Sequence, residues 1–457
     1  MKKIYVVTDL GPGDGGKGGV VHKISHMQGA HTILKVGGAQ GSHGVSTSSG
    51  KRFAFSQFGC GTFEGVRTHL TKRFVASPEG ILNEAQALDQ GCGLSDVYSL
   101  LTVDEDVICA TPYHGISSRL KELARGDNLR GTIGTGVGEA FRYNQRFPEL
   151  TIRAKDLFSQ NLRELLAAVR DQLHVDLESV ISGTFLESDR VLVEQEVDRL
   201  LDPKYLEFIL HRFRTAAKHV RIVGQEYFHD LTTSYGVMVV ESSHGVLTDH
   251  FQGFHPHTSA IRTLPRFTRG MLEEVGYDGE LVNIGVTRAY QIRHGAGPMP
   301  TADEAMAENL LPGSSKDENR YQGKVRVGPL DLVLLRYAIA ACGGPDAFDG
   351  LAVTWFDQIQ ENGSWFLCRS YKGATDQNFF TPQGELKVRF GDDEEQLKYQ
   401  EELGHHLERC VPVLTEHTVS PGPNFNFLTC SAVLNEALRV PVRMVSFGST
   451  EQEKLCR

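Results

Sequence analysis

The feature that most constrains the fold is a short apolar segment that leads directly into a glycine cluster near the start of the chain. Ile4 to Leu10 is rich in β-branched residues, and five of the eight residues from Gly11 to Gly18 are glycine. Glycine loses much conformational freedom on folding, so such a cluster usually serves a purpose. The pattern predicts a buried first strand, a phosphate-binding loop and a helix over Val20 to Met27.

The loop fits two phosphate-binding motifs, each incompletely. Gly11, Gly13 and Gly16 match GxGxxG, but a dinucleotide site also needs an acid about 20 residues later, and His31 to Lys35 contains none. The segment also matches GxxxxGK, with Gly18 where a P-loop has Ser or Thr. Glycine amides before a helix still suit phosphate, so we expect a phosphate loop and not a dehydrogenase site.

Several further apolar segments end in glycine or polar residues and alternate with helical patterns. This alternation predicts an α/β fold with a mainly parallel central sheet flanked by helices, and ligands outside the carboxyl ends of its strands. We expect one domain over residues 1–457 with helical and loop insertions. The expected strands are Thr32–Val36, Val237–Val240, Leu281–Val286, Leu351–Thr354 and Val440–Val445, with a hairpin or meander of Phe366–Tyr371 and Glu385–Phe390. The expected helices include Ser77–Asp89, Lys155–His174, Glu187–Val220 with a break at Asp202–Pro203, and Leu330–Cys342.

Composition narrows the class of protein. The formal net charge of -10 disfavours a general nucleic-acid-binding surface. The eight cysteines are scattered without a CxxC pair, which disfavours a zinc site or a redox dithiol. We recognise neither a signal peptide nor an apolar stretch of membrane-spanning length, so we expect a cytoplasmic protein without membrane association.

Seven segments, in order along the chain, resemble motifs of the adenylosuccinate synthetase family. The clearest are GDGGKG at Gly13–Gly18, beside the family's GDEGKG, and RAYQIRHGAGPMPT at Arg288–Thr301, beside KAYxTRVGxGPFPTE. The others are Gly37–Gly44 (family GGxNAGHT), Gly131–Phe141, Glu241–Ser259, Val327–Ala338 and Thr354–Asp357 (family TKLD). The resemblance implies a P-loop-related fold, a homodimer, and a GTP- and magnesium-dependent carbon–nitrogen ligase. Such an enzyme of purine biosynthesis joins an IMP-like monophosphate to L-aspartate through a 6-phosphoryl purine.

The resemblance implies that the motifs at Gly13–Gly18 and Gly37–Gly44 supply the catalytic residues. Asp14 matches the acid that takes the N1 proton of the purine and contacts Mg²⁺, and His43 matches the histidine that assists phosphoryl transfer to O6. Lys17 matches the lysine that stabilises the transferred phosphoryl group. Ser42 matches a position whose backbone carbonyl binds the metal.

Residues for the nucleoside triphosphate follow from the same resemblance. Asp357 matches the acid that pairs with the two donors of guanine, which ATP lacks. Trp355 replaces the family's lysine, and we expect it to stack on the base. The remaining expected contacts are Gly13, Gly15, Gly16, Gly18 and Gly44 around the phosphates, and Ser446 and Gly448 near the base.

The expected purine monophosphate site is a mixture of retained and replaced residues. Thr132 and Ser259 retain hydroxyls that can bind phosphate, whereas Ile133 replaces a threonine. The remaining positions are Gln40 for an asparagine, His244 for a glutamine, and Arg146 for an arginine donated across the dimer interface.

The amino-acid loop departs most from the family. Where the family has a run of arginines, this chain has Lys324 and Arg326, with His294 nearby in the preceding motif. Two cations suffice for one or two carboxylates, but lysine does not equal a planar arginine fork. We therefore expect an acidic amino acid that is bound more weakly than usual.

Two alternatives remain open. A divergent paralogue could act on another purine, such as dGMP in the manner of 2-aminoadenylosuccinate synthesis, or on another amino acid. The phage relatives with that activity lack the catalytic aspartate, whereas this chain retains Asp14. A non-catalytic nucleotide-binding protein is the second alternative, and Lys17 and His43 argue against it.

Overall fold

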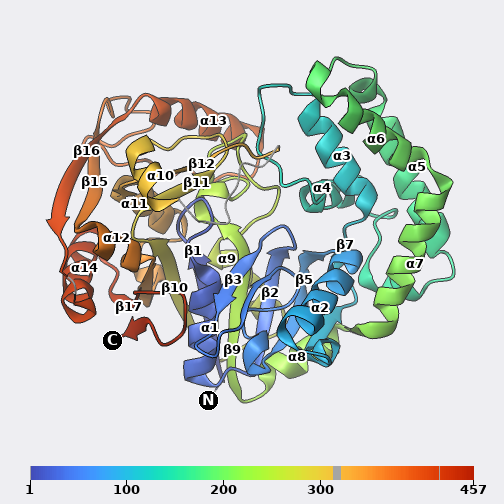
Figure 1. The fold of residues 1–457 in the computed structure, drawn as a ribbon, viewed down its shortest axis with the longest axis horizontal. Helices are drawn as coiled ribbons and strands as arrows, with labels where there is room; N and C mark the ends of the chain where they lie inside the picture. Colours follow the sequence, from blue (N-terminus) through green and yellow to red (C-terminus); the bar gives the residue numbers. More distant parts are fainter. Residues whose placement is uncertain (1, 312–320, 421) are drawn as a thin grey trace.

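The computed structural model describes residues 2–311, 321–420 and 422–457. A large sheet crosses the middle of the molecule, with helices on both sides (Figure 1). Its strand order is β18 (Lys454–Cys456), β17 (Val442–Ser446), β14 (Gly350–Thr354), β10 (Glu280–Arg288), β1 (Lys2–Asp9), β9 (Gly236–Gly245), β2 (Thr32–Gly38), β5 (Arg67–Ala76), β6 (Leu101–Asp104) and β8 (Arg221–Val223), with β7 (Ile108–Cys109) beside β5.

The described strands of this sheet pair in parallel, except β17 with β18. Both faces of a parallel sheet must be buried, and apolar side chains that alternate along β1 point toward helices on both faces. Val7 packs in the core that includes α1 (Lys17–Gln28), whereas Ile4 and Val6 pack with α8 (Gln225–Thr233) and α9 (Pro265–Glu274). The predicted α/β class with a mainly parallel sheet is confirmed.

A lobe of helices lies beyond the β5 side of the sheet, on the right of Figure 1. Ser77 caps its first helix, because the hydroxyl accepts a hydrogen bond from Gly80 N at 3.0 Å. The break expected at Asp202–Pro203 separates two helices, with Pro203 at the first helical position. The helices are α2 (Pro78–Cys92), α3 (Pro112–Leu123), α4 (Val137–Arg146), α5 (Leu162–Ile181), α6 (Arg190–Leu201) and α7 (Pro203–His219).

The C-terminal third forms a second lobe around its own apolar core, on the left of Figure 1. It contains a small sheet, β13 (Leu330–Asp331), β15 (Ser364–Lys372) and β16 (Val411–Thr418), and an antiparallel pair, β11 (Gln291–His294) with β12 (Val325–Gly328). Its helices are α10 (Glu304–Leu310), α11 (Leu332–Ala341), α12 (Phe356–Asn362), α13 (Glu394–Glu408) and α14 (Pro423–Leu438). A further pair, β3 (His43–Ser46) with β4 (Arg52–Phe55), follows β2.

Four expected boundaries were wrong. β9 continues through the polar segment Glu241 to Gly245, because distant charges compensate its buried acid. The helix expected from Lys155 begins as a 3-10 turn, and α5 starts at Leu162. The expected helix from Leu330 begins as the strand β13. Glu385–Phe390 makes only an isolated bridge, and the true partner of β15 is β16.

Across the described ranges, no helix has both the length and the apolarity that crossing a bilayer requires.

Candidate functional site

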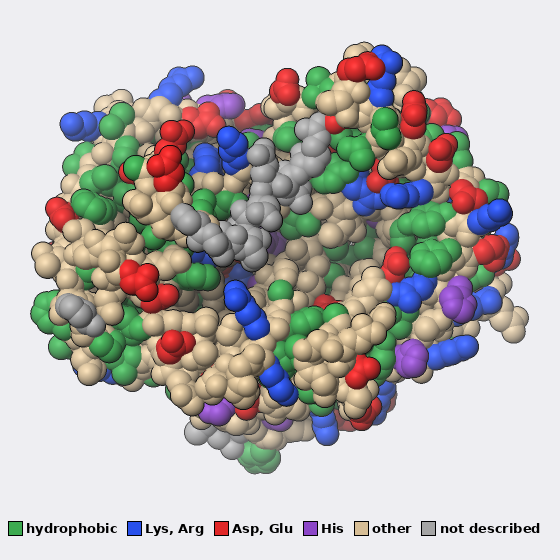
Figure 2. Space-filling model, in the orientation of Figure 1, with side chains coloured by type: hydrophobic (Ala, Val, Ile, Leu, Met, Phe, Trp, Pro, Cys, Tyr) green, Lys and Arg blue, Asp and Glu red, His purple; other side chains and the backbone are tan. Residues whose placement is uncertain are grey.

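The segments expected to bind ligands follow six strands that are neighbours in the sheet. In spatial order these are β17, β14, β10, β1, β9 and β2, and their carboxyl ends meet at one edge. In Figure 1 this edge faces the gap between the two lobes, and Figure 2 shows the surface hollowed there. The expected site residues lie in the last residues of these strands or in the segments that follow them: Ser446 and Gly448, Trp355 and Asp357, His294, Asp14 and Lys17, His244 and Ser259, and Gln40, Ser42 and His43.

The glycine loop is organised by Asp9, a buried acid at the end of β1. Its carboxylate accepts hydrogen bonds from Gly11 N at 2.8 Å and Gly15 N at 2.9 Å, and lies 2.9 Å from Lys17 Nζ. A Cβ at Gly15 would lie 2.7 Å from Asp9 Oδ1, so the carboxylate fits only beside glycine. Lys17 is therefore held in place before any phosphate arrives. Asp9 was not predicted from the sequence, although an acid that ends an apolar strand before a glycine loop is a visible signal.

Asp14 lies at the tip of the loop in a left-handed conformation, with φ 56°. Its Oδ2 lies 2.5 Å from His294 Nε2, and its carbonyl oxygen accepts a hydrogen bond from Arg288 Nε at 2.6 Å. His294 was expected at the amino-acid site, and the structure brings it against the proposed catalytic acid.

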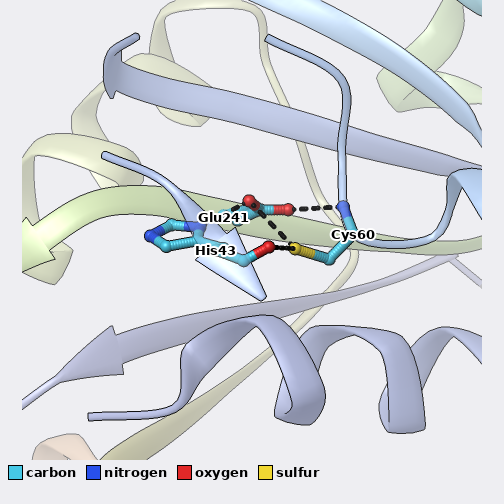
Figure 3. Close-up of side chains that lie close together, drawn as sticks. All are labelled: His43, Cys60 and Glu241. Carbon is cyan, nitrogen blue, oxygen red and sulfur yellow. Dashed lines mark hydrogen bonds and ion pairs between the residues drawn. The ribbon is translucent and has the colours of Figure 1, made fainter. Parts of the chain in front are cut away.

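His43 lies in a buried charge cluster with Cys60 and Glu241 (Figure 3), which Lys35 completes. His43 Nδ1 and Lys35 Nζ each lie 2.7 Å from Glu241 Oε1, and Cys60 N donates to Glu241 Oε2 at 2.9 Å. The sequence analysis placed Glu241 in a motif without assigning it a role, and it missed Lys35.

The charges of this cluster fix the orientation of the imidazole. Burial opposes ionisation of Glu241, yet Lys35 and His43 hold the pKa of its carboxyl well below the usual range. Burial lowers the pKa of His43, and the hydrogen bond to Glu241 opposes that effect. Because Glu241 is ionised, the proton on Nδ1 of His43 is donated to it. The other ring nitrogen, Nε2, lies 3.2 Å from the carbonyl oxygen of Ser243.

The nitrogen, sulfur and oxygen atoms of His43, Cys60 and Glu241 lie within 4.8 Å of one another, the spacing of a metal-ligand set. The ammonium of Lys35 already supplies a positive charge at Glu241, which disfavours a second cation there. We therefore regard these residues as a support for His43.

The glycine loop and the His43 segment pack backbone against backbone. A Cβ at Gly18 would lie 2.5 Å from the carbonyl oxygen of Gly44, so only glycine permits this approach. The packing fixes the start of α1 relative to His43.

The expected purine side contains a chain of hydrogen bonds. Gln40 Nε2 donates to Ser243 Oγ at 3.4 Å, Ser243 Oγ lies 3.0 Å from His244 Nδ1, and His244 Nε2 lies 3.2 Å from Ile261 O. Burial lowers the pKa of His244 to about 3, so its ring is neutral. Nε2 must then carry the proton that reaches the carbonyl, and Nδ1 accepts from Ser243.

The other expected purine-side residues are more scattered. Thr132 Oγ1 lies 2.8 Å from Ser118 Oγ, and Ser259 Oγ accepts from Ile261 N at 3.2 Å. Ile133 is exposed. Arg146 lies on the outer side of α4, where it pairs with Asp176 at 2.7 Å.

The expected base-binding residues lie at the ends of β14 and β17, which pair in parallel. β14 ends at Thr354, and Trp355, with φ 60°, begins α12, so Asp357 lies in the first turn of a helix and not at a strand end. Burial raises the pKa of Asp357 above its usual value. Ser446 Oγ is buried and has no hydrogen-bond partner in the described part of the chain.

Two arginines face each other across the β11–β12 pair, where Arg293 is in register with Arg326. Arg293 donates to the carbonyls of Ala296 and His257, and Arg326 to those of Gly295 and Gly297. Nη1 of Arg293 is buried without a partner among the described residues.

Electrostatics makes this arginine pair unfavourable without an anion. Burial and the neighbouring Arg326 lower the pKa of Arg293, and Glu408 offsets this only partly. Lys324 is exposed next to this pair. Lys324 and Arg326 were predicted from the sequence to bind the amino acid, whereas Arg293 was not.

Comparisons with known proteins identify the family to which the chain is similar. A family model described as adenylosuccinate synthetase matches residues 6–454. The chain is 26% identical to an adenylosuccinate synthetase of Thioalkalivibrio sulfidiphilus over 100% of this chain and 98% of that protein. It is 27% identical to the enzyme of Alkalilimnicola ehrlichii over 81% of each chain.

Solved structures share the fold. The fully ligated adenylosuccinate synthetase of Plasmodium falciparum superposes with a TM-score of 0.74 at 18% identity, over 99% of both chains. A succinoaminodeoxyadenylate synthetase of cyanophage S-2L, bound to dGMP and to dATP as an energy donor, superposes with a TM-score of 0.56 at 15% identity, over 100% of this chain and 95% of that one. Because the family model spans nearly the whole sequence, this chain belongs to the adenylosuccinate synthetase family of carbon–nitrogen ligases.

Proposed function

We propose that the protein joins a purine nucleoside monophosphate of the IMP type to L-aspartate at the expense of GTP, through a 6-phosphoryl purine. The observation that most supports this is the placement of Asp14 and His43. They follow β1 and β2, on either side of β9, and each is held by other side chains of the site. That arrangement suits a reaction with one proton transfer and one phosphoryl transfer.

In this proposal Asp14 removes the N1 proton of the purine, so that O6 becomes the nucleophile for the γ-phosphoryl group. His43, with Nδ1 held by Glu241, donates a hydrogen bond from Nε2 to the phosphoryl oxygens as their charge develops, which requires the imidazolium form with a proton on both ring nitrogens. Lys17 is fixed by Asp9 and neutralises phosphate charge at the same place. The amine then displaces phosphate from C6 of the purine.

Magnesium fits the donors available at the loop. The carboxylate of Asp14 and the backbone carbonyl of Ser42 are hard oxygen ligands of the kind that Mg²⁺ prefers. The bound ion would neutralise triphosphate charge. Within the proposal, Gly13, Gly15, Gly16, Gly18 and Gly44 surround the phosphates.

For the base, Asp357 accepts the two donors of guanine, and Trp355 stacks on the ring. The buried hydroxyl of Ser446, beside β14, is available to the base. These assignments favour GTP over ATP.

For the amino acid, the facing guanidiniums of Arg293 and Arg326 need an anion, and a carboxylate supplies it in a planar, bidentate form. Lys324 at the exposed edge adds a second positive contact for a dicarboxylate. An acidic amino acid is therefore the proposed amine donor.

A different purine is the second candidate, and the changed purine side favours it. Gln40 and His244 replace residues that the family uses near the purine, Ser243 connects them by hydrogen bonds, and the phage neighbour of similar fold binds dGMP. A cytoplasmic homodimer in which Arg146 reaches the partner's monophosphate completes the proposal, and it requires Arg146 to leave Asp176.

The test is a matrix of purine monophosphates (IMP, GMP, dGMP, XMP), triphosphates (GTP, ATP, dATP) and amines, scored by phosphate release and product mass. We expect the mass of IMP plus aspartate minus water, with GTP the best donor. If IMP is inert and dGMP gives product, the second candidate is correct. If phosphate is released without any coupled product, the ligase proposal is wrong.

A further inference from the structure

The conformation of Asp14 is held from outside its own loop. A left-handed backbone is costly for a residue with a side chain and persists only where the surroundings impose it. Arg288, a buried residue at the end of β10, donates its Nε hydrogen to the Asp14 carbonyl at 2.6 Å. Because the donor is charged, this bond is stronger than a neutral one.

Arg288 is in turn held by the helix that bears the base-binding residues. Its guanidinium lies 4.3 Å from the ring centre of Trp355, a cation–π contact. It also donates to the Tyr290 hydroxyl, which donates to Gln358 Oε1 at 2.6 Å. Trp355, Asp357 and Gln358 belong to one turn of chain at the start of α12.

A second contact joins the same two parts of the site. The hydroxyl of Thr354, at the end of β14, donates to the carbonyl of Gly15 at 2.7 Å. The segment that leads from β14 into α12 is thus joined to the glycine loop at two successive carbonyls, through Arg288 at Asp14 and directly at Gly15.

Both partners of the cation–π contact differ from the family motifs quoted above, which have lysine at the positions of Arg288 and Trp355. Two lysines would repel each other, whereas arginine and tryptophan attract. The paired replacement indicates that the contact itself serves the site.

We propose that Arg288 is a positioning residue for Asp14, and that Trp355 makes this positioning depend on the base of the bound triphosphate. A base that packs on the indole or pairs with Asp357 fixes Trp355. Trp355 then fixes the guanidinium, and the guanidinium fixes the backbone of the general base. Base identity therefore controls turnover as well as binding. The inference rests on the proposed function, because it concerns the same reaction.

The test measures kcat and KM for GTP and ATP, with Mg²⁺, monophosphate and amino acid saturating, in the wild type, Arg288→Lys and Trp355→Leu. In the wild type we expect a higher kcat with GTP than with ATP. Arg288→Lys should lower kcat with GTP by roughly 10- to 100-fold, since slight misplacement of a reacting group has such effects. The KM for GTP should change less than about threefold, because Asp357 is intact.

Trp355→Leu should give equal kcat values for the two donors, and it leaves Arg288 in place if the first variant does not fold. Arg73→Lys, at an exposed ion pair with Glu274, is the matched control and should resemble the wild type. If both site variants keep the wild-type ratio of kcat between GTP and ATP, the inference is wrong. Failure of the proposed function is separate, because the wild type itself would then form no product with either donor.

Discussion

Buried charge is arranged differently at the two ends of the site: it is paired with opposite charge at one end and lies beside like charge at the other. At the phosphate loop, Lys17 lies 2.9 Å from Asp9, and Lys35 lies 2.7 Å from Glu241. At the β11–β12 pair, Arg293 and Arg326 face each other, and their acceptors in the described ranges are backbone carbonyls. At the first end the described charges are paired with one another, whereas at the second end the described side chains carry an excess of positive charge.

The difference distinguishes groups that position the reacting atoms from groups that bind a ligand. Paired buried charges hold functional atoms in place at a desolvation cost that the chain already offsets. Unpaired like charges are unfavourable until an anion binds, so they make ligand binding and local order depend on each other. The comparison predicts that substitutions at the first end damage rate or stability, and at the second end damage amino-acid binding.

The largest expected effect is at Asp14. Asp14→Asn should lower kcat by roughly 100- to 10,000-fold, because a proton acceptor is lost while the shape is retained. Circular dichroism and the unfolding midpoint should match the wild type. Asp278→Asn, at an exposed pair with Lys2, is the control and should be fully active. A folded Asp14→Asn enzyme with normal turnover would exclude Asp14 from the chemistry.

Lys35→Met tests the paired end by stability. Removing one member of a buried ion pair leaves an uncompensated charge and costs about 3–5 kcal/mol. Denaturant unfolding should show this loss. Lys72→Met removes a partly exposed pair with Glu274 and should cost about 0–1 kcal/mol. Equal stabilities of the two variants would show that Lys35 does not compensate Glu241.

Arg326→Gln tests the unpaired end. The KM for the amino acid should rise by an amount equivalent to about 1.5–3 kcal/mol, the scale of a hydrogen bond to a charged group. The free energy of unfolding should change less than in Lys35→Met, because the substitution also relieves repulsion with Arg293. Lys324→Gln, at the exposed edge, should have a smaller effect on KM. A large loss of stability with an unchanged KM would reverse the roles of the two ends.

The smallest effect concerns the base. Asp357→Asn should reduce the preference for GTP over ATP by at most about 1.5–3 kcal/mol, because the amide side chain keeps one hydrogen-bond acceptor. Glu361→Gln, an exposed position of the same helix, should leave the preference unchanged. If the wild type uses ATP and GTP equally, Trp355 has changed the base pocket and Asp357 does not select the base.

The parts of the fold predicted from sequence were those determined by local pattern. β1 and its glycine loop, the Ser77 cap and the break at Asp202–Pro203 each depend on neighbouring residues, and the structure contains all of them. The continuation of β9 through Glu241 could not be predicted, because its buried carboxylate is compensated by Lys35, 206 residues away in sequence.

The same distinction applies to the candidate site. Motif order predicted which segments would meet at the edge of the sheet. It did not predict that His294 would lie against Asp14, that Arg288 would contact Trp355, or that Arg293 would face Arg326. These contacts depend on strand register and on the path of distant loops, which single residue types do not encode.

The most direct test of the account is a titration of amine donors with the wild-type enzyme, saturated with purine monophosphate, Mg²⁺ and GTP. Aspartate, glutamate, glycine, serine and ammonia are compared by kcat/KM and product mass, and repeated with Arg326→Ala. The account predicts that a dicarboxylate gives the highest kcat/KM and that Arg326→Ala removes this advantage. An uncharged amine that outcompetes both dicarboxylates, in a reaction unaffected by Arg326→Ala, would contradict it.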